Sequence, residues 1–308
     1  MDLRQLAALL AVADHGTFSA AARSLQTVQS NVSTHVARLE RELGVILVDR
    51  ANGTLTEEGR VVAARARRIR AELEALSSDV ASMHDEISGS ARVGVIGTTA
   101  RWLVPILFDR LSKEHPAVRL VVVDATTSML LPQLGRGEID LAVVNLPTDD
   151  PDVTEQPLFD EDRVVVAPND HPLARFDELS LAELSNHELL LAAVGTVFRT
   201  ELDAAAEAAG VTLRPKAEVD GLRLVASLAF QGFGAAIVPA SAAPDWLLST
   251  GQWKRIPVVG MPRRSVGLVR RRRGLLSAAA RAVHEVIVEA VRIDASSQLG
   301  IHPASQPS

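Results

Sequence analysis

The hydrophobic pattern of the chain changes near residue 90, and this change most constrains the fold. Before it, apolar residues recur every three or four positions, which is the period of helices. After it, short continuous apolar runs alternate with helical stretches, the order typical of a parallel sheet covered by helices on both faces. A chain of 308 residues has room for two or three domains. We therefore predict a helical N-terminal part joined to an α/β part.

The first sixty residues predict three short helices and a hairpin. The third helix, expected from Thr27 to Leu43, has one apolar stripe formed by Val32, Val36, Leu39 and Leu43. Gly44 follows as the glycine that commonly ends a helix. The run Val45–Val48 is expected to be a strand, and Asn52-Gly53 supplies the turn of a hairpin. This order is the outline of a winged helix-turn-helix, which we expect over residues 1–58.

A long helix is predicted next, from a cap at Thr56 to about Ile87. Its apolar residues have the a/d spacing of a coiled coil, at Ile69, Leu73, Leu76, Val80, Met83 and Ile87. This seam favours a homodimer over the alternative of a single amphipathic helix lying on a domain. Ser88–Ser90 is expected to be a hinge, so residues 59–90 would form the linker and dimerisation helix.

Residues 91–293 predict two α/β lobes with a cleft between them. The expected strands are 92–96, 118–124, 139–144, 163–167, 235–238 and 265–269, and the expected helices are 101–114, 129–136, 198–209 and 275–291. The tail 294–308 is rich in Ser, Pro and Gln, and we expect it to be disordered.

The outward face of the third helix carries small and medium hydrogen-bonding side chains. Ser30, Asn31, Thr34 and Arg38 cluster opposite the apolar stripe, and Gln29, Ser33 and His35 flank them. These residue types suit major-groove base edges and phosphate oxygens. A merely solvated helical face is the alternative on this feature alone, and Arg50 at the base of the hairpin favours DNA.

A net charge of −6 is unusual for a protein that binds nucleic acid, but the distribution of the charges along the chain is compatible with DNA binding. Residues 1–70 hold ten Arg against seven acids, a net charge of +3, whereas residues 71–88 hold five acids and no base. We expect the arginines between Arg60 and Arg70 to form a solvated helix face. We expect Arg270–Arg273 to be surface or subunit-contact charge.

The segment AARSLQTVQSNVSTHVARLERELGVILVDR, followed by a turn and LTEEG, resembles the N-terminal signature of the LysR-type transcriptional regulators. His171–Ala174 and Gly232–Pro239 are similar to recurring segments of the effector domain of that family. The resemblance covers about residues 1–293. It implies a winged helix-turn-helix, a long linker helix, and a two-lobed α/β effector domain resembling periplasmic binding proteins.

The resemblance implies that Gln29, Ser30 and Thr34 lie in the major groove. Ser33 and His35 would hold phosphates or neighbouring bases, and Arg38 and Arg50 would contact the backbone. The sequence departs from the family at Val28, where a hydroxyl residue is common, at Thr34, which is often Arg, and in a wing without an extra basic residue. Each departure removes a possible phosphate contact, so weaker sequence-independent binding and a gentler salt dependence are expected.

Several hydroxyl residues follow predicted strands and open helices, where α/β sheets commonly bind ligands and helix N-termini favour anions. The resemblance places the effector between the lobes near these segments, at Thr98, Thr99, Thr127, Ser128, Thr196 and Phe198, with Arg199 as a weaker candidate to pair with a carboxylate. Simple helix capping is the alternative for each Thr and Ser. With no Tyr and few other rings, the composition favours a small carboxylate over a flat aromatic effector.

Composition and motifs exclude several other classes. The absence of Cys excludes disulfides, thiolate metal sites and cysteine nucleophiles. The His residues have no metal-ligand spacing and no nucleotide-binding or hydrolase motif follows a strand, so we expect no enzyme, metal or cofactor. Asp140 is expected to be structural. The N-terminal apolar run is too short to cross a membrane, so a cytoplasmic chain is expected.

Together these features predict a DNA-binding transcriptional regulator modulated by a small-molecule effector. Its expected partners are double-stranded DNA with an inverted repeat, the effector, and further copies of itself as a homodimer or, by family resemblance, a homotetramer. Two alternatives remain open: an α/β solute-binding or enzymatic domain with a helical interaction module, and a regulator that has become a protein-interaction module.

Overall fold

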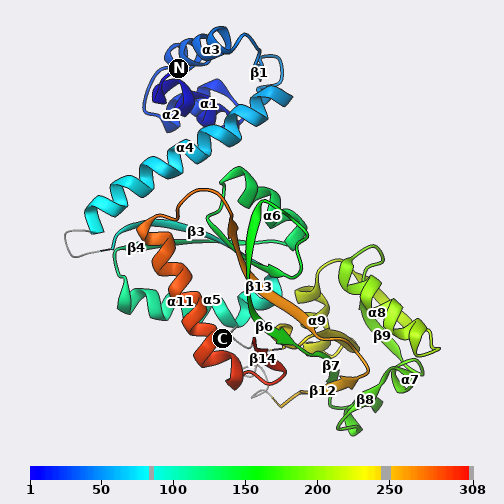
Figure 1. Cartoon of the computed structure of the whole chain (residues 1–308). Helices are drawn as coiled ribbons and strands as arrows, with labels where there is room; N and C mark the ends of the chain where they lie inside the picture. The colour runs from blue at the N-terminus through cyan, green and yellow to red at the C-terminus, as the bar shows by residue number, and fades with distance from the viewer. Residues whose placement is uncertain (83–86, 244–250, 305–308) are drawn as a thin grey trace.

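The computed structural model describes residues 1–82, 87–243 and 251–304. The N-terminal head consists of α1 (Leu3–His15), α2 (Phe18–Ser24) and α3 (Gln29–Leu43), followed by the hairpin β1 (Val48–Asp49) and β2 (Thr54–Leu55). Its core holds the stripe predicted on α3, with Val32, Val36 and Leu39 at most 1% exposed, whereas Leu43 is 40% exposed. The head is a winged helix-turn-helix (Figure 1).

The strand expected over Val45–Val48 is shorter than predicted. Val45 and Ile46 are exposed, and the main-chain N–H groups of Leu47 and Val48 donate to the Glu40 carboxylate at 3.0 and 3.3 Å. The Glu40 carboxylate of α3 therefore takes the N–H of Leu47, and the ladder with the return strand begins at Val48. The hairpin is therefore attached to α3 as well as to itself.

The predicted linker helix is α4 (Glu57–Ser82), 26 residues long as described. The Thr56 hydroxyl begins it by accepting from the N–H of Gly59 at 2.9 Å, as the sequence indicated. Four residues of the predicted a/d seam are 39–62% exposed, namely Ile69, Leu73, Leu76 and Val80. Met83 lies outside the described residues, and Ile87 packs on the core of the first lobe. Figure 1 shows α4 running from the head to that lobe.

The first lobe, lobe I, contains a sheet with the order β14-β6-β13-β5-β3-β4. Its strands are β3 (Gly89–Val95), β4 (Val118–Asp124), β5 (Leu141–Asn145), β6 (Val153–Glu161), β13 (Arg264–Arg271) and β14 (Ile301–Pro303), and its helices are α5 (Gly97–Glu114), α6 (Thr127–Arg136) and α11 (Ala278–Asp294). β3 is parallel to β4 and β5, as the βαβαβ order predicted, but β13 runs antiparallel to β5 and β6. The sheet is therefore mixed.

The second lobe, lobe II, contains a mixed sheet with the order β10-β9-β11-β7-β12-β8. Its strands are β7 (Arg163–Pro168), β8 (Leu179–Ser180), β9 (Glu188–Ala192), β10 (Arg214–Val219), β11 (Ala235–Pro239) and β12 (Trp253–Val259), and its helices are α7 (Leu181–Leu184), α8 (Val197–Ala208) and α9 (Leu222–Phe230). The chain passes between the lobes at Asp162 and at residues 260–263.

One hydrophobic core joins the two lobes. Trp102 and Phe159 of lobe I belong to the same buried cluster as Val225, Val238 and Trp253 of lobe II. The rings of Trp102 and Phe159 pack edge to face with centroids 5.6 Å apart. A separate cluster fills the far side of lobe II.

The expected boundaries of the sensor part need two corrections. The hinge predicted at Ser88–Ser90 overlaps β3, because Gly89 and Ser90 already pair with Val118 and Arg119 of β4.

The tail 294–308, expected to be disordered, forms structure as far as residue 304. A 3-10 turn, Ala295–Ser297, precedes β14, which pairs antiparallel with β6. Ile301 is only 5% exposed, and His302 Nε2 lies 2.8 Å from an oxygen of Asp162. Burial of one apolar side chain and long-range strand pairing thus outweigh the polar composition of this segment.

Candidate DNA-binding surface and effector site

The exposed face of α3 carries the polar side chains predicted from its periodicity. Ser30, Asn31, Thr34 and Arg38 are exposed, and Asn31 donates to the Thr27 hydroxyl at 3.0 Å. Gln29 is also exposed and accepts from Ser19 of α2 at 2.7 Å, which fixes its carbonyl end and leaves its amide N–H donors outward. This face therefore presents donors and acceptors of the kind that read base edges.

Arg50 is held between the hairpin and α3. Its guanidinium donates to the Ser33 hydroxyl at 3.1 Å and to the Glu40 carboxylate at 3.0 Å, and it lies over the Phe18 ring. These contacts bring Ser33 and Arg50 together beside the exposed face of α3. About half of the Arg50 side chain remains exposed, so its remaining donors can reach an external anion.

His35 lies differently from the other predicted residues of α3. It is half-buried, and its Nδ1 atom is buried with no hydrogen-bond partner. Its Nδ1 side is therefore not part of the exposed face of α3.

The first turn of α3 has no side-chain cap. Val28 occupies the N-cap position with extended backbone and is 60% exposed. Because no side chain accepts from the first N–H groups of the helix, these donors and the positive end of the helix dipole face outward. The departure from the family noted at Val28 thus leaves main-chain donors where a hydroxyl would stand.

The tip of the hairpin is fixed against the head by a glycine. Gly53 has φ +69°, and a Cβ built on it would lie 2.2 Å from the carbonyl oxygen of Gly16. Asp49 orders the rest of the turn by accepting from the N–H of Ala51 and the side chain of Asn52. Only glycine fits here, so the position of the wing relative to α1 and α2 is set by this contact.

One exposed cation on α3 was missed by the sequence analysis. Arg41 lies seven residues after Thr34 and is exposed on the same side of the helix. The signal was present, because positions seven apart share a helical face. The stripe considered ended at Arg38.

Thr98 and Thr99 begin α5 and are buried. The Thr98 hydroxyl accepts from Arg264 at 2.8 Å, and the Thr99 hydroxyl is buried with no partner. The N-cap of this helix, Ile96, offers no side-chain acceptor. The amino end of α5 therefore lies where β3 ends, beside one satisfied and one unsatisfied hydroxyl.

Thr127 and Ser128 begin α6 at the end of β4. The Thr127 hydroxyl accepts from the N–H of Asn145 at 3.1 Å, and the Ser128 hydroxyl lies 3.0 Å from that of Thr126. The side-chain oxygen of Asn145 is buried and unpartnered. Thr99, Asn145 and the α6 terminus all lie at the carboxyl edge of β3, β4 and β5, so the two lobe I pairs share an edge of one sheet.

The lobe II residues have mainly internal contacts. Thr196 caps α8 by accepting from the N–H of Arg199, and Phe198 is 7% exposed in the lobe II core with Arg163 over its ring. The Arg199 guanidinium donates to Asp203, to Glu218 and to the carbonyl of Ala192. Although burial acts to lower it, these two carboxylates hold the pKa of Arg199 above its usual value.

Two further arginines lie where the lobes meet. Arg223 of α9 forms an ion pair of 2.5 Å with Asp124 at the end of β4, and Arg101 of α5 donates to the carbonyl of Ala242 at 2.9 Å. Burial, with a smaller contribution from Arg223, lowers the pKa of Arg101. Sequence patterns could not identify these residues, because the contacts join segments 99 and 141 positions apart.

Two cavities are found elsewhere in the described residues. One of about 960 Å³ lies between α4 and lobe I, and one of about 710 Å³ lies beside α8 on lobe II. Neither is lined by a predicted effector residue. No group of three or more acidic or His side chains suited to a metal is found in the described part of the chain.

Asp140 has the structural role expected for it. Its carboxylate accepts from the main-chain N–H of Arg92 at 2.8 Å, and its own N–H donates to the Arg92 carbonyl. Burial raises the pKa of Asp140. The residue thus joins the start of β5 to β3.

Comparison with known families agrees with this architecture. Residues 3–60 match the model of the bacterial regulatory helix-turn-helix protein, lysR family, and residues 84–292 match that of the LysR substrate binding domain. The chain therefore belongs to the LysR family of DNA-binding transcription regulators, and not to a family of enzymes. No helix in the described ranges is both long and apolar enough to span a bilayer.

Several relatives are similar over nearly the whole chain. A probable hydrogen peroxide-inducible genes activator of Mycobacterium leprae is 32% identical over 294 residues, covering 93% of each chain. The DNA-binding transcriptional dual regulator OxyR of Escherichia coli is 29% identical and covers 95% of each chain. A solved full-length OxyR from Pseudomonas aeruginosa, carrying a cysteine-to-aspartate substitution, superposes with a TM-score of 0.78 at 25% identity, covering 100% of this chain and 99% of that one.

Proposed function

We propose that this regulator binds an inverted repeat in double-stranded DNA by placing α3 of each of two protomers in successive major grooves. The observation that carries the proposal is the exposed face of α3, where the side chains of Ser30, Thr34 and Arg38 have no hydrogen-bond or ion-pair partner among the described residues and the helix start is uncapped. Arg50, anchored on Ser33, is then placed to contact the flanking phosphates.

Two protomers are joined, in this proposal, by the exposed seam of α4. The four apolar side chains of this seam, Ile69, Leu73, Leu76 and Val80, lie open to water in the single chain. Pairing with the same seam of a second copy would bury these side chains, and each Å² of apolar surface removed from water would stabilise the dimer by about 25 cal/mol. We expect Leu73→Asp and Leu76→Asp to convert dimers into monomers in analytical ultracentrifugation, whereas tetramers would require contacts beyond this seam.

The DNA proposal is tested by gel retardation with the promoter region of the regulator's own gene. Thr34→Ala should weaken binding about 5- to 150-fold, corresponding to 1–3 kcal/mol for a good base contact. Arg38→Ala, which removes the expected backbone contact, should weaken binding about equally for all sequences and reduce the salt slope by about 1.

Arg214→Ala is the matched control, because Arg214 is a similarly exposed arginine on lobe II with only a long ion pair of 3.9 Å. Its binding should equal that of the unaltered chain. Unchanged retention with both α3 variants would instead favour a protein-interaction module and overturn the proposal.

The effector in this proposal is a small carboxylate that binds reversibly where the lobes meet. The uncapped start of α5, the unpartnered hydroxyl of Thr99 and the Arg223–Asp124 pair support it, because an anion could compete with Asp124 for the guanidinium. Although the similar relatives carry names that refer to hydrogen peroxide, a chain with no Cys cannot respond by thiol oxidation.

A thermal-shift measurement on the full chain tests this effector class. Acetate, succinate and citrate are compared with hydrogen peroxide, each at matched ionic strength. We expect a concentration-dependent rise in Tm with at least one carboxylate, reduced by Arg223→Ala, and none with peroxide. A rise with peroxide alone would refute the carboxylate proposal.

A further inference from the structure

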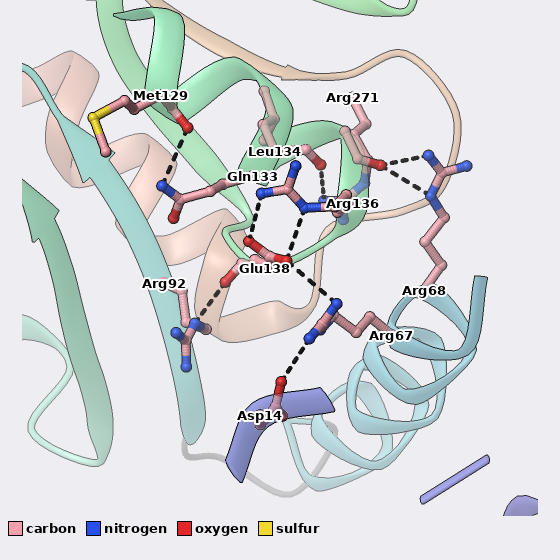
Figure 2. A network of polar contacts seen from close by, with 11 residues as sticks. Asp14, Arg67, Arg68, Arg92, Met129, Gln133, Leu134, Arg136, Glu138 and Arg271 are labelled. Atoms are coloured by element: carbon pink, nitrogen blue, oxygen red, sulfur yellow. Dashed lines mark hydrogen bonds and ion pairs between the residues drawn. The ribbon is translucent and has the colours of Figure 1, made fainter. Parts of the chain in front are cut away.

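One arginine of the linker helix joins the head to lobe I of the same chain. Figure 2 shows Arg67 of α4 between two carboxylates, that of Asp14 at the end of α1 and that of Glu138 after α6. Its nitrogens lie 2.5 Å from Asp14 and 3.2 Å from Glu138. The Arg67 side chain is only 12% exposed, so these pairs are partly shielded from water and salt. The arginines of this stretch of α4 were expected to be solvated, and Arg67 is not.

The neighbouring Arg68 contacts the turn at the end of α6, formed by residues 135–138. Arg68 donates through two of its nitrogens to the main-chain carbonyl of Gly135, one of them at 3.2 Å. Gly137 follows with φ +72°, and a Cβ there would be 3.5 Å from the Arg68 side chain. The close approach of α4 to the turn formed by residues 135–138 thus involves both charge and main-chain hydrogen bonds.

The same turn is held firmly from within lobe I. Arg136 donates to both oxygens of Glu138 at 2.8 and 3.0 Å, and Arg92 of β3 donates to the Glu138 carbonyl. Arg271 of β13 donates to the carbonyl of Leu134 at 3.0 Å (Figure 2). It also donates to the carbonyl of Ile139 at 3.0 Å. Because three arginines of lobe I fix its main chain and carboxylate, the turn moves with lobe I and not with α4.

α6 connects this turn to the edge where the effector is proposed to bind. The helix spans Thr127–Arg136, and its first residue is hydrogen-bonded to Asn145 at that edge. Ten helical residues extend about 15 Å, and a hydrogen-bonded helix of this length moves nearly as a rigid rod. A displacement at its start therefore reaches the turn at its end.

We infer that the contact of Arg67 and Arg68 with the 135–138 turn sets the orientation of the head relative to its own sensor, and that movement of α6 releases it. This inference rests on the proposed function, because it gives the effector site a route to the DNA-binding surface. In the held state, Arg67 ties the end of α1 to lobe I through Asp14 and Glu138. In the released state, α4 loses the contacts of Arg67 and Arg68 with this turn, and the head can turn about the linker.

The orientation of the head can be measured directly in the full chain. Because the sequence has no Cys, Ser24→Cys on α2 and Ser112→Cys on α5 supply two exposed and unique positions for spin labels. The labelled protein is mixed with excess unlabelled chain, so that pulsed electron paramagnetic resonance measures distances between the two spin labels of one protomer. We expect one narrow distance distribution for the otherwise unaltered chain.

Glu138→Gln keeps the shape of the side chain and removes its charge, and Arg67→Met removes the bridge. Each should broaden or shift the distribution, and Asp14→Asn combined with Glu138→Gln should have less than the sum of their separate effects, because both act through Arg67. Glu289→Gln is the control, since Glu289 pairs with Arg292 on α11 away from the head. The control should leave the distribution unchanged.

A second readout separates this inference from the proposed function. The bend of promoter DNA, measured by circular permutation in gels, should change with Glu138→Gln and not with Glu289→Gln. Altered distances without any DNA binding would support the contact and refute the proposed function. Unaltered distances in both Glu138→Gln and Arg67→Met, with Tm retained, would overturn the inference even if DNA binding were normal.

Discussion

Replacing Glu161 with Gln tests how the crossover between the lobes is stabilised. Glu161 is fully buried at the end of β6, and its carboxylate accepts from Arg264 Nε at 2.7 Å and from the main-chain N–H of Ser241 at 2.9 Å. Arg264 also donates to Thr98, and Arg163, 2% exposed, lies nearby. Arg163 has its own ion pair with Glu201, so the Glu161 carboxylate is the partner of one buried guanidinium group, that of Arg264.

The magnitude follows from the charge left behind. Removing one partner of a buried ion pair costs about 3–5 kcal/mol, because the remaining charge is uncompensated. Gln keeps an acceptor oxygen, so we expect the lower end, about 3 kcal/mol. For a folded part of about 200 residues this corresponds to a Tm lower by about 6–12 °C.

Differential scanning calorimetry of the full chain measures this change. The double variant Glu161→Gln with Arg264→Met should lose less than the sum of the single variants by at least about 1 kcal/mol, because the second change removes the uncompensated charge. Glu289→Gln, which breaks an exposed pair, should lower the Tm by less than about 2 °C. A Glu161→Gln variant as stable as this control, or additive effects in the double variant, would refute the reasoning.

Three other perturbations address separate parts of the chain. Gly53→Ala should weaken promoter binding in gel retardation and lower the Tm, because its Cβ would collide with the Gly16 carbonyl; normal binding would contradict the fixed wing. Burial raises the pKa of Asp140, so the ionised carboxylate destabilises the folded state. The contribution of the protonated carboxyl to the free energy of unfolding is present at low pH and is lost as the pH rises through the folded-state pKa. Asp140→Asn should therefore raise the Tm at about pH 7.5, with the gain shrinking toward about pH 4, and a gain independent of pH would exclude this cause. Deletion of residues 295–308 should cost about 2 kcal/mol in denaturant unfolding through loss of the buried Ile301, whereas a disordered tail would make the deletion silent.

Local patterns predicted much of the head. The spacing of Val32, Val36 and Leu39 correctly divided α3 into a buried and an exposed face, because a helical period of 3.6 fixes both faces at once. In lobe I, the strand at Val118–Asp124 was predicted with its observed bounds. A continuous apolar run of this length between a predicted helix and a turn favours a buried strand over a helix.

Long-range pairing explains what the sequence could not predict. β14 exists because Ile301 meets β6 about 140 positions earlier, and Arg67 is shielded because a turn 71 positions later contacts it. Arg199 is a candidate effector-binding residue because it follows a strand. Whether its guanidinium is free to bind a carboxylate ligand depends on neighbours such as Glu218, which helical periodicity does not reveal. The shared carboxyl edge of β3, β4 and β5 was predictable from the strand order, whereas the charged residues beside it, Arg223 and Asp124, were not.

The hydrophobic core shared by the two lobes limits how they can move. A wide hinge opening would expose Trp102, Val225 and Trp253 to water. This exposure would cost about 25 cal/mol for each Å² of apolar surface. Sliding of α5 against α9 by an ångström or two keeps those contacts and is the shear type of motion. If the proposed ligand binds at this junction, the packed core allows only small displacements there, so its effect must be carried along the helices and not by a wide separation of the lobes.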